Sequence, residues 1–131
     1  PENLNEQESI EAIHQNKTGS LIRCACQMGA ICGGATESQY EAIDNYGNTI
    51  GLMYQIVDDL IDLHGSPDHV GKATGKDAIS GKTTYPGTIG VKKSEQTVQE
   101  LHKHAENSLI QLGKSAETLS SFNVWMAHRT R

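Results

Sequence analysis

Apolar side chains recur every three or four residues along most of this chain, which is the spacing of amphipathic helices. The best-defined segment runs from about Ser38 to Leu63. Its apolar stripe consists of Ile43, Tyr46, Ile50, Met53, Tyr54, Val57 and Ile61. Gly47 and Gly51 lie inside this segment, where each glycine costs about 1 kcal/mol relative to alanine. We therefore expect both glycines to permit the close approach of another helix or of a ligand.

The same periodicity predicts further helices on both sides of this segment. They cover residues 8–16, 20–32, 94–112 and 116–129. Lys17, Thr18 and Gly19 are expected to interrupt the first pair, with Thr18 as the N-cap of the helix that follows. No stretch alternates apolar and polar residues in the way a strand requires. The chain is therefore predicted to be all-α, with residues 1–131 forming a portion of one domain.

Residues 64–86 differ from the helical segments in composition. Glycines and prolines punctuate this stretch, and lysines lie between them, so we expect a loop. The loop follows directly after the acidic end of the helix that covers residues 38–63. Its lysines are Lys72, Lys76 and Lys82.

Composition and net charge narrow the classes of protein to which this chain can belong. The chain has 131 residues, of which 36% are hydrophobic, with one Trp and one Phe. This core is thin for an independent globule, so we expect part of the apolar surface to pack against something outside the chain. The net charge of −5 argues against a nucleic-acid binder. No apolar run approaches the roughly 20 residues of a membrane span.

The N-terminal residues and the cysteines bear on the cellular location of the protein. No secretory signal is visible, and the chain starts at Pro1 in a polar stretch, as a boundary inside a longer protein would. The number of cysteines is odd, and their spacing does not form a zinc-binding pattern. They are Cys24, Cys26 and Cys32. We expect buried or half-buried reduced thiols in a cytoplasmic protein.

Three carboxylates at the end of the central helix carry the strongest chemical signal. Asp58, Asp59 and Asp62 repel one another and oppose the helix dipole. A helical wheel places them with Gln55 on one face, beside the apolar stripe. A hard divalent cation such as Mg²⁺ would offset this repulsion, since it prefers carboxylate oxygens and often shares them with phosphates.

Positive charges follow the carboxylates in the order that a diphosphate site needs. Three loop lysines are within reach of the acidic cluster, and Lys17 is expected at a helix start, where backbone N–H groups also favour anions. The competing interpretation is a solvated charged face beside ordinary surface lysines. A nucleotide-binding P-loop is rejected, because five residues rather than four separate Gly75 from Gly81 and no strand precedes them.

Four ordered motifs resemble the C-terminal half of a trans-isoprenyl diphosphate synthase, most closely of the bacterial farnesyl and geranylgeranyl type. The motifs cover residues 14–22, 50–62, 71–77 and 81–86. The resemblance implies an isoprenoid-synthase helical bundle around a central cavity. It also implies a prenyltransferase of isoprenoid biosynthesis that condenses an allylic diphosphate with isopentenyl diphosphate to a short-chain product. The second aspartate-rich motif would be Asp58, Asp59 and Asp62, holding Mg²⁺.

The resemblance also implies roles for residues outside the acidic motif. Lys17 and Lys72 would contact the allylic diphosphate. Thr18 and Gln55 would lie near the reacting carbons and the leaving group. Lys82 would face the same pocket and bind substrate.

The chain departs from the family pattern in one major respect. The first aspartate-rich motif and the basic residues around it, which belong to the N-terminal half, are not in this sequence. We therefore expect a chain that is inactive alone, from an enzyme that is a homodimer at full length. Two alternatives stay open, a non-catalytic subunit of a heteromeric prenyl synthase and a terpene cyclase-like fold. The Lys17-Thr18-Gly19 and Gly81-Lys82-Thr83 segments favour the synthase over the cyclase.

Overall fold

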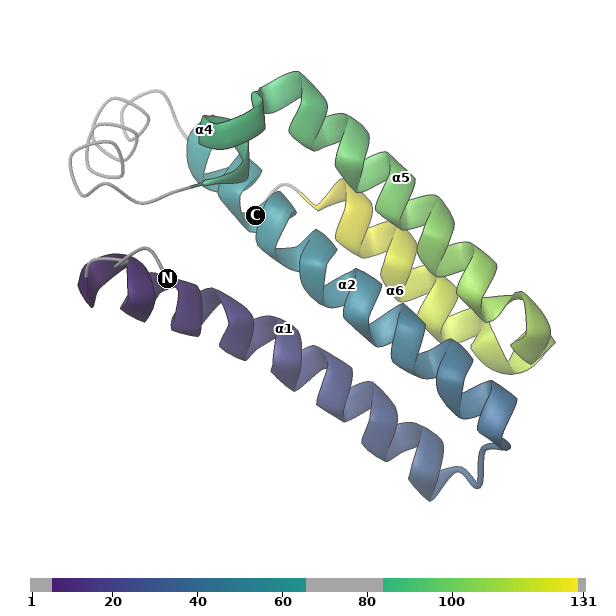
Figure 1. The fold of residues 1–131 in the computed structure, drawn as a ribbon. Coiled ribbons are helices and arrows are strands. Elements are labelled where there is room, and N and C mark those ends of the chain that lie inside the picture. The colour runs from purple at the N-terminus through teal and green to yellow at the C-terminus, as the bar shows by residue number, and fades with distance from the viewer. Residues whose placement is uncertain (1–5, 66–83, 130–131) are drawn as a thin grey trace.

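The computed structural model describes residues 6–65 and 84–129, and every regular element in these residues is a helix (Figure 1). The all-α prediction is therefore confirmed. The elements are α1 (Glu6–Cys32), α2 (Glu37–His64), α4 (Tyr85–Ile89), α5 (Val91–Leu109), the 3-10 segment η1 (Ile110–Ala116) and α6 (Glu117–His128). Within these residues, no helix is long and apolar enough to cross a membrane.

Helix α1 is continuous, so the predicted interruption at Lys17-Thr18-Gly19 is wrong. Thr18 lies in the middle of the helix and caps nothing, and Lys17 is likewise far from the helix start at Glu6. Backbone N–H groups at these positions belong to the helical ladder, so they offer no anion site of the kind expected at a helix N-terminus. Gly19 is tolerated here because it lies at the contact between α1 and α2.

Small residues let α1 and α2 pack closely side by side (Figure 1). A Cβ added at Gly51 would lie 3.0 Å from both the Cα and the carbonyl oxygen of Gly19. A Cβ added at Gly47 would lie 2.9 Å from the Cβ of Cys26. The expected close approach at both glycines of α2 is therefore confirmed, with another helix as the neighbour. Residue 19 pairs with residue 51 and residue 26 with residue 47, so the two helices run antiparallel.

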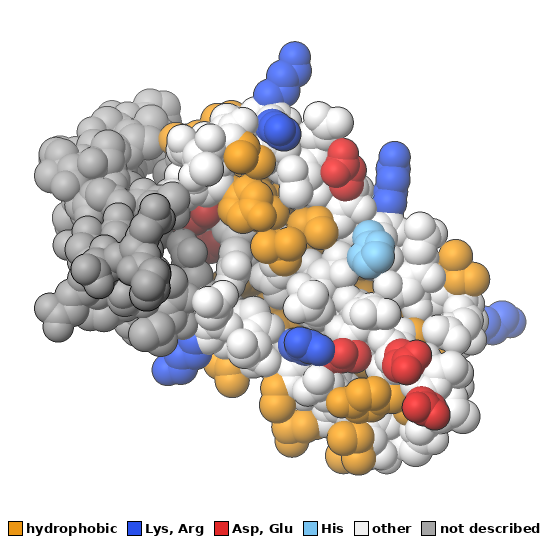
Figure 2. Space-filling model, viewed as in Figure 1, with side chains coloured by type: hydrophobic (Ala, Val, Ile, Leu, Met, Phe, Trp, Pro, Cys, Tyr) orange, Lys and Arg blue, Asp and Glu red, His pale blue; other side chains and the backbone are white. Residues whose placement is uncertain are grey.

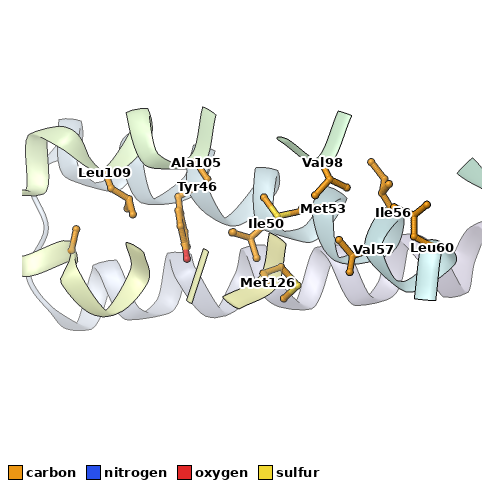
Figure 3. Close-up of a cluster of buried hydrophobic side chains, with 11 residues drawn as sticks. Tyr46, Ile50, Met53, Ile56, Val57, Leu60, Val98, Ala105, Leu109 and Met126 are labelled. Carbon is orange, nitrogen blue, oxygen red and sulfur yellow. The ribbon is translucent and has the colours of Figure 1, made fainter. Parts of the chain in front are cut away.

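The core lies between α2, α5 and α6 (Figure 3). Tyr46, Ile50, Met53 and Val57 of the predicted stripe are at most 4% exposed. Ile56 and Leu60 are also buried, because α4 and α5 cover a side of α2 that the predicted stripe did not include. The hydrophobic core is completed by Val98, Ala105 and Leu109 of α5, Ala116 of η1 and Met126 of α6.

The predicted helix over residues 94–112 differs from α5 at both ends. Helix α5 starts earlier, at Val91, and gives way at Ile110 to the 3-10 segment, where Gly113 takes a φ of 57°.

Polar groups hold α5 and α6 together as a hairpin. Within the hairpin, the Asn123 side-chain amide donates to a carboxylate oxygen of Glu106 at 2.7 Å. Ser120 donates to the same carboxylate. These contacts bury Asn123 completely and hold α6 against α5.

Several large apolar side chains remain exposed on α1 and α6. Figure 2 shows apolar side chains at several places on one face of the molecule. They are Leu21, Met28 and Ile31 of α1 and Phe122, Val124 and Trp125 of α6. Most of the apolar side chains in the helix predicted over residues 20–32 are therefore exposed in the described part of the chain. The cysteine prediction is also wrong in part, because Cys24 and Cys32 are exposed and only Cys26 is half-buried.

Tyr46 provides a test of the core. Its hydroxyl donates to the carbonyl oxygen of Leu119 at 2.7 Å, and burial raises its pKa. We expect Tyr46→Phe to lower the free energy of unfolding by about 1 kcal/mol at neutral pH. An unfolded tyrosine ionises near pH 10 and the folded Tyr46 does not, so the native protein loses stability as the pH rises above about 10. The substituted protein should lose less over that range. Urea unfolding at pH 7 and pH 10.5 measures both effects, and an identical alkaline loss in the two proteins would contradict this role.

Candidate functional site

The predicted site lies where the C-terminal end of α2 passes α1. A Cβ added at Gly19 would lie 3.4 Å from the Nε2 atom of Gln55, so the Gln55 side chain reaches α1 beside Thr18. Because the helices are antiparallel, the N-terminal half of α1 accompanies the acidic end of α2 (Figure 1). The fold therefore brings together two of the four predicted motifs, which are about 35 residues apart in the sequence.

Lys17 and Thr18 occupy different sides of α1. Residues of a helix are rotated by about 100° per position, so Lys17 lies about 200° around α1 from Gly19 and Thr18 about 100°. Thr18 is half-buried, whereas Lys17 is exposed on the side that faces away from the α2 contact. Gln55 and Thr18 thus lie beside the contact of α1 with α2, and Lys17 lies on the solvent-exposed side of α1. The predicted contacts at Lys72 and Lys82 lie outside the described residues.

Asp59 is turned inward, unlike the other two carboxylates. It is 8% exposed, and its Oδ2 atom accepts a hydrogen bond from the backbone N–H of Tyr85 at 3.1 Å. Tyr85 is the first residue of α4, whose first N–H groups have no partner within the helix. A carboxylate is favoured there by the helix dipole as well. Asp59 therefore joins α2 to α4, whereas the Asp62 side chain is exposed.

Helix α4 itself is a departure from prediction. The expected loop over residues 64–86 ends in this short helix, which begins at Tyr85. Thr84 caps it by accepting a hydrogen bond from the N–H of Gly87 at 3.0 Å, and Pro86 is buried in its first turn. Proline is favoured in a first turn, because the N–H it lacks would be unpaired there. Thr84 followed by Pro86 is a sequence signal for this helix, since a threonine cap precedes a proline in the first turn.

Asp58 and Asp62 are one helical turn apart near the end of α2. Asp62 is exposed, and the Asp58 side chain is 51% exposed. In the part of the chain that the structure describes, no three His, Cys, Asp or Glu side chains converge to hold a metal ion by themselves. Mg²⁺ is usually bound through one or two carboxylates together with substrate phosphates, so the Asp58–Asp62 pair fits such an ion as part of a complex with diphosphate.

Arg129 is a charged neighbour of this pair that the sequence patterns did not reveal. Its Nη2 atom lies 3.4 Å from Oδ1 of Asp58. The two residues are 71 positions apart, and only the packing of α6 along α2 brings them together. The Arg129 guanidinium also lies over the ring of Tyr54, with its Cζ atom 4.4 Å from the ring centroid.

Comparison with known proteins places these motifs in a family. The family model described as polyprenyl synthetase matches residues 1–119. Geranylgeranyl pyrophosphate synthase 4 of Arabidopsis thaliana is 44% identical over 102 residues, which are 78% of this chain and 27% of that protein. The mitochondrial geranylgeranyl pyrophosphate synthase 10 of the same plant is 43% identical, over 79% of this chain and 30% of its own length. Geranylfarnesyl diphosphate synthase of Leucosceptrum canum, a chloroplastic protein, is 38% identical over 79% of this chain and 28% of its own length.

The chain therefore spans little more than a quarter of the length of these relatives. The matched residues contain the acidic end of α2 and the crossing of α1 with α2. Their helical structure agrees with the fold that the motifs imply. On the match to most of its length, the chain belongs to the polyprenyl synthetase family.

Proposed function

We propose that this chain contributes one side of the active site of a short-chain prenyl diphosphate synthase. The reaction joins an allylic diphosphate to isopentenyl diphosphate and releases diphosphate. The observation that carries this proposal is the pairing of Asp58 and Asp62 near the end of α2, beside the point where Gln55 meets α1. The names of the relatives support a geranylgeranyl-type or related product.

The proposed metal ligands are Asp58 and Asp62, with Asp59 supporting the motif from the inside. When bound, Mg²⁺ would stabilise the negative charge that develops on the departing diphosphate. Two carboxylates separated by one helical turn leave the remaining coordination positions to phosphate oxygens and water. This arrangement suits a cation that arrives with its substrate better than one held permanently by the protein.

The roles proposed for the other predicted residues come from the family motifs, and for Thr18 and Gln55 also from their place at the helix crossing. Lys17 and Lys72 would neutralise the allylic diphosphate, and Lys82 would add to this positive charge. Thr18 and Gln55 present a hydroxyl and an amide at the helix crossing, where they can orient the leaving group. The Gln55 amide lies at the close contact of α1 with α2, where a Cβ added at Gly19 would be 3.4 Å from its Nε2 atom.

A second candidate is a non-catalytic subunit of a heteromeric prenyl synthase. The exposed Leu21, Met28 and Ile31 on α1 favour it, since a row of exposed apolar side chains suits a helix that packs against further protein. The two candidates differ in where catalysis takes place. We favour the catalytic role because Asp58 and Asp62 are both present on one turn of α2. A homodimer of the whole enzyme and a cytoplasmic location remain predictions, and several relatives carry chloroplastic or mitochondrial names.

Metal removal tests the proposed function. The whole enzyme that contains these residues should make a prenyl diphosphate from geranyl diphosphate and isopentenyl diphosphate in the presence of Mg²⁺. Chelation should abolish the product, and added Mg²⁺ should restore it. The 131-residue chain alone should give none. Turnover that persists after chelation would overturn the metal-dependent mechanism, and turnover by the chain alone would overturn its role as one side of a larger site.

A further inference from the structure

Arg129 is anchored at the C-terminal end of α6 by Tyr54. The guanidinium lies over the Tyr54 ring, with Cζ 4.4 Å from the centroid, as in a cation–π contact. Its Nη2 atom also approaches the Tyr54 carbonyl oxygen at 3.4 Å. The side chain is 10% exposed. These contacts fix the positive charge on α2 independently of any carboxylate.

The contact of Arg129 with Asp58 is loose and uses one oxygen. The same Nη2 atom lies 3.4 Å from Oδ1 of Asp58. An ion pair between α1 and α2 shows the contrast. Arg23 binds both carboxylate oxygens of Asp44, through Nε at 2.7 Å and Nη2 at 2.8 Å. Hydrogen bonding to Arg23 also lowers the pKa of Asp44. Asp44 is thus fully engaged, whereas Asp58 keeps half of its side chain exposed and can accept a further ligand.

We propose that Arg129 is a positioning residue that makes Asp58 select a metal–diphosphate complex over the free metal ion. This inference rests on the proposed function. Arg129 orients the Asp58 carboxylate from one side and leaves its other side open. It also places a fixed positive charge beside that carboxylate. The ligand is therefore a divalent cation already bound to the diphosphate group of the allylic substrate.

The selection follows from the sign of the charges. A free divalent cation is repelled by the Arg129 guanidinium as it approaches Asp58. A cation bound to diphosphate carries a net negative charge, and the same guanidinium attracts it. The charge of Arg129 is screened less than that of a surface arginine, because little of its side chain contacts water. Its Nε atom is buried without a hydrogen-bond partner among the described groups, which is an unfavourable arrangement for a purely stabilising contact.

A structural role for Arg129 is the competing explanation. Arg129 joins the end of α6 to α2 through Tyr54, and its loss could loosen the bundle. Loosening would weaken the binding of both forms of the metal together. Charge selection changes the two affinities in opposite directions, so the ratio between them separates the explanations.

The test titrates the chain with Mn²⁺ alone and with Mn²⁺ plus inorganic diphosphate, followed by electron paramagnetic resonance. Arg129→Met should weaken binding of the Mn²⁺–diphosphate complex about tenfold and tighten binding of free Mn²⁺ a few-fold. Arg129→Lys should keep part of the selectivity, since it retains the charge but not the planar group over Tyr54. The matched control is Arg23→Met, which breaks the pair of Arg23 with Asp44 of α2 and should change neither affinity.

Each other outcome contradicts a defined part of the account. Equal changes in both affinities, or no change in either, would overturn the selection by Arg129. If Arg129→Met does not fold, Tyr54→Leu removes the ring beneath the guanidinium, and it should shift the affinity ratio in the same direction. Asp58→Asn separates the two proposals. If it leaves Mn²⁺–diphosphate binding unchanged, the proposed metal site is wrong. If it weakens binding while Arg129→Met does not, only the inference about Arg129 fails.

Discussion

Asp58→Ala in the whole enzyme is expected to lower Mg²⁺-dependent product formation by about 100-fold or more, the usual loss when one preorganised charge stabiliser is removed. Asp58 and Asp62 together supply the protein oxygens that we assign to the cation. The loss of one leaves a single carboxylate and an unpaired Arg129 guanidinium beside the diphosphate. The rate should fall at saturating substrate, because the cation stabilises charge that develops during the reaction.

The control for Asp58→Ala removes a carboxylate elsewhere on the same helix. Glu41 is exposed near the N-terminal end of α2, far along the helix from the acidic end. Glu41→Gln changes the net charge in the same direction and should leave the rate unaltered. Steady-state kinetics over a range of Mg²⁺ concentrations compares the two proteins. Full activity of Asp58→Ala at ordinary Mg²⁺ concentrations would contradict the metal assignment.

Gly51→Val is expected to lower the free energy of unfolding by about 3 kcal/mol, at the upper end of the usual cost of overpacking. The side chain would have to enter a space where even a Cβ lies 3.0 Å from the backbone of Gly19. Backbone cannot rotate away as a side chain can, so α1 has to move. That movement would also separate Gln55 from Thr18, and substrate binding should weaken together with stability.

Gly29→Ala is the matched control for the helix crossing. Gly29 also lies within a long helix, but a Cβ added there meets nothing within 4 Å. Alanine is the better helix former by about 1 kcal/mol, so this substitution should slightly stabilise the protein. Urea unfolding of both proteins measures the difference. A destabilisation by Gly29→Ala equal to that by Gly51→Val would show that the crossing is not the cause.

Local patterns were sufficient to predict the helical class and most of α2. The period of the apolar residues located Tyr46, Ile50, Met53 and Val57 in the core, because α2 packs on several neighbours along its length. The local sequence does not predict that α1 continues through Lys17-Thr18-Gly19. A glycine after a threonine normally suggests a break, and only the partner helix at Gly51 explains why the helix continues.

The motifs of the proposed site can be recognised in the sequence, but the arrangement of their residues in space cannot. Spacing on one helix grouped the three aspartates with Gln55, and the family resemblance supplied their roles. Neither the spacing nor the resemblance shows that Asp59 accepts a hydrogen bond from the N–H of Tyr85, because that contact depends on where α4 starts. Arg129 was missed for a similar reason. A lone arginine near the chain end has no local pattern, and its position beside Asp58 arises from the packing of α6 along α2.

The most direct test of the central claim is to locate a bound metal–diphosphate complex on the chain. Mn²⁺ broadens the amide signals of nearby residues in nuclear magnetic resonance spectra. With inorganic diphosphate present, we expect selective broadening at residues 58–62 of α2 and 17–19 of α1. Residues 37–42 at the other end of α2, about 31 Å away along the helix between the centres of the two segments, should stay sharp. Broadening that centres elsewhere, or that is the same without diphosphate, would contradict a metal–diphosphate site at this helix crossing.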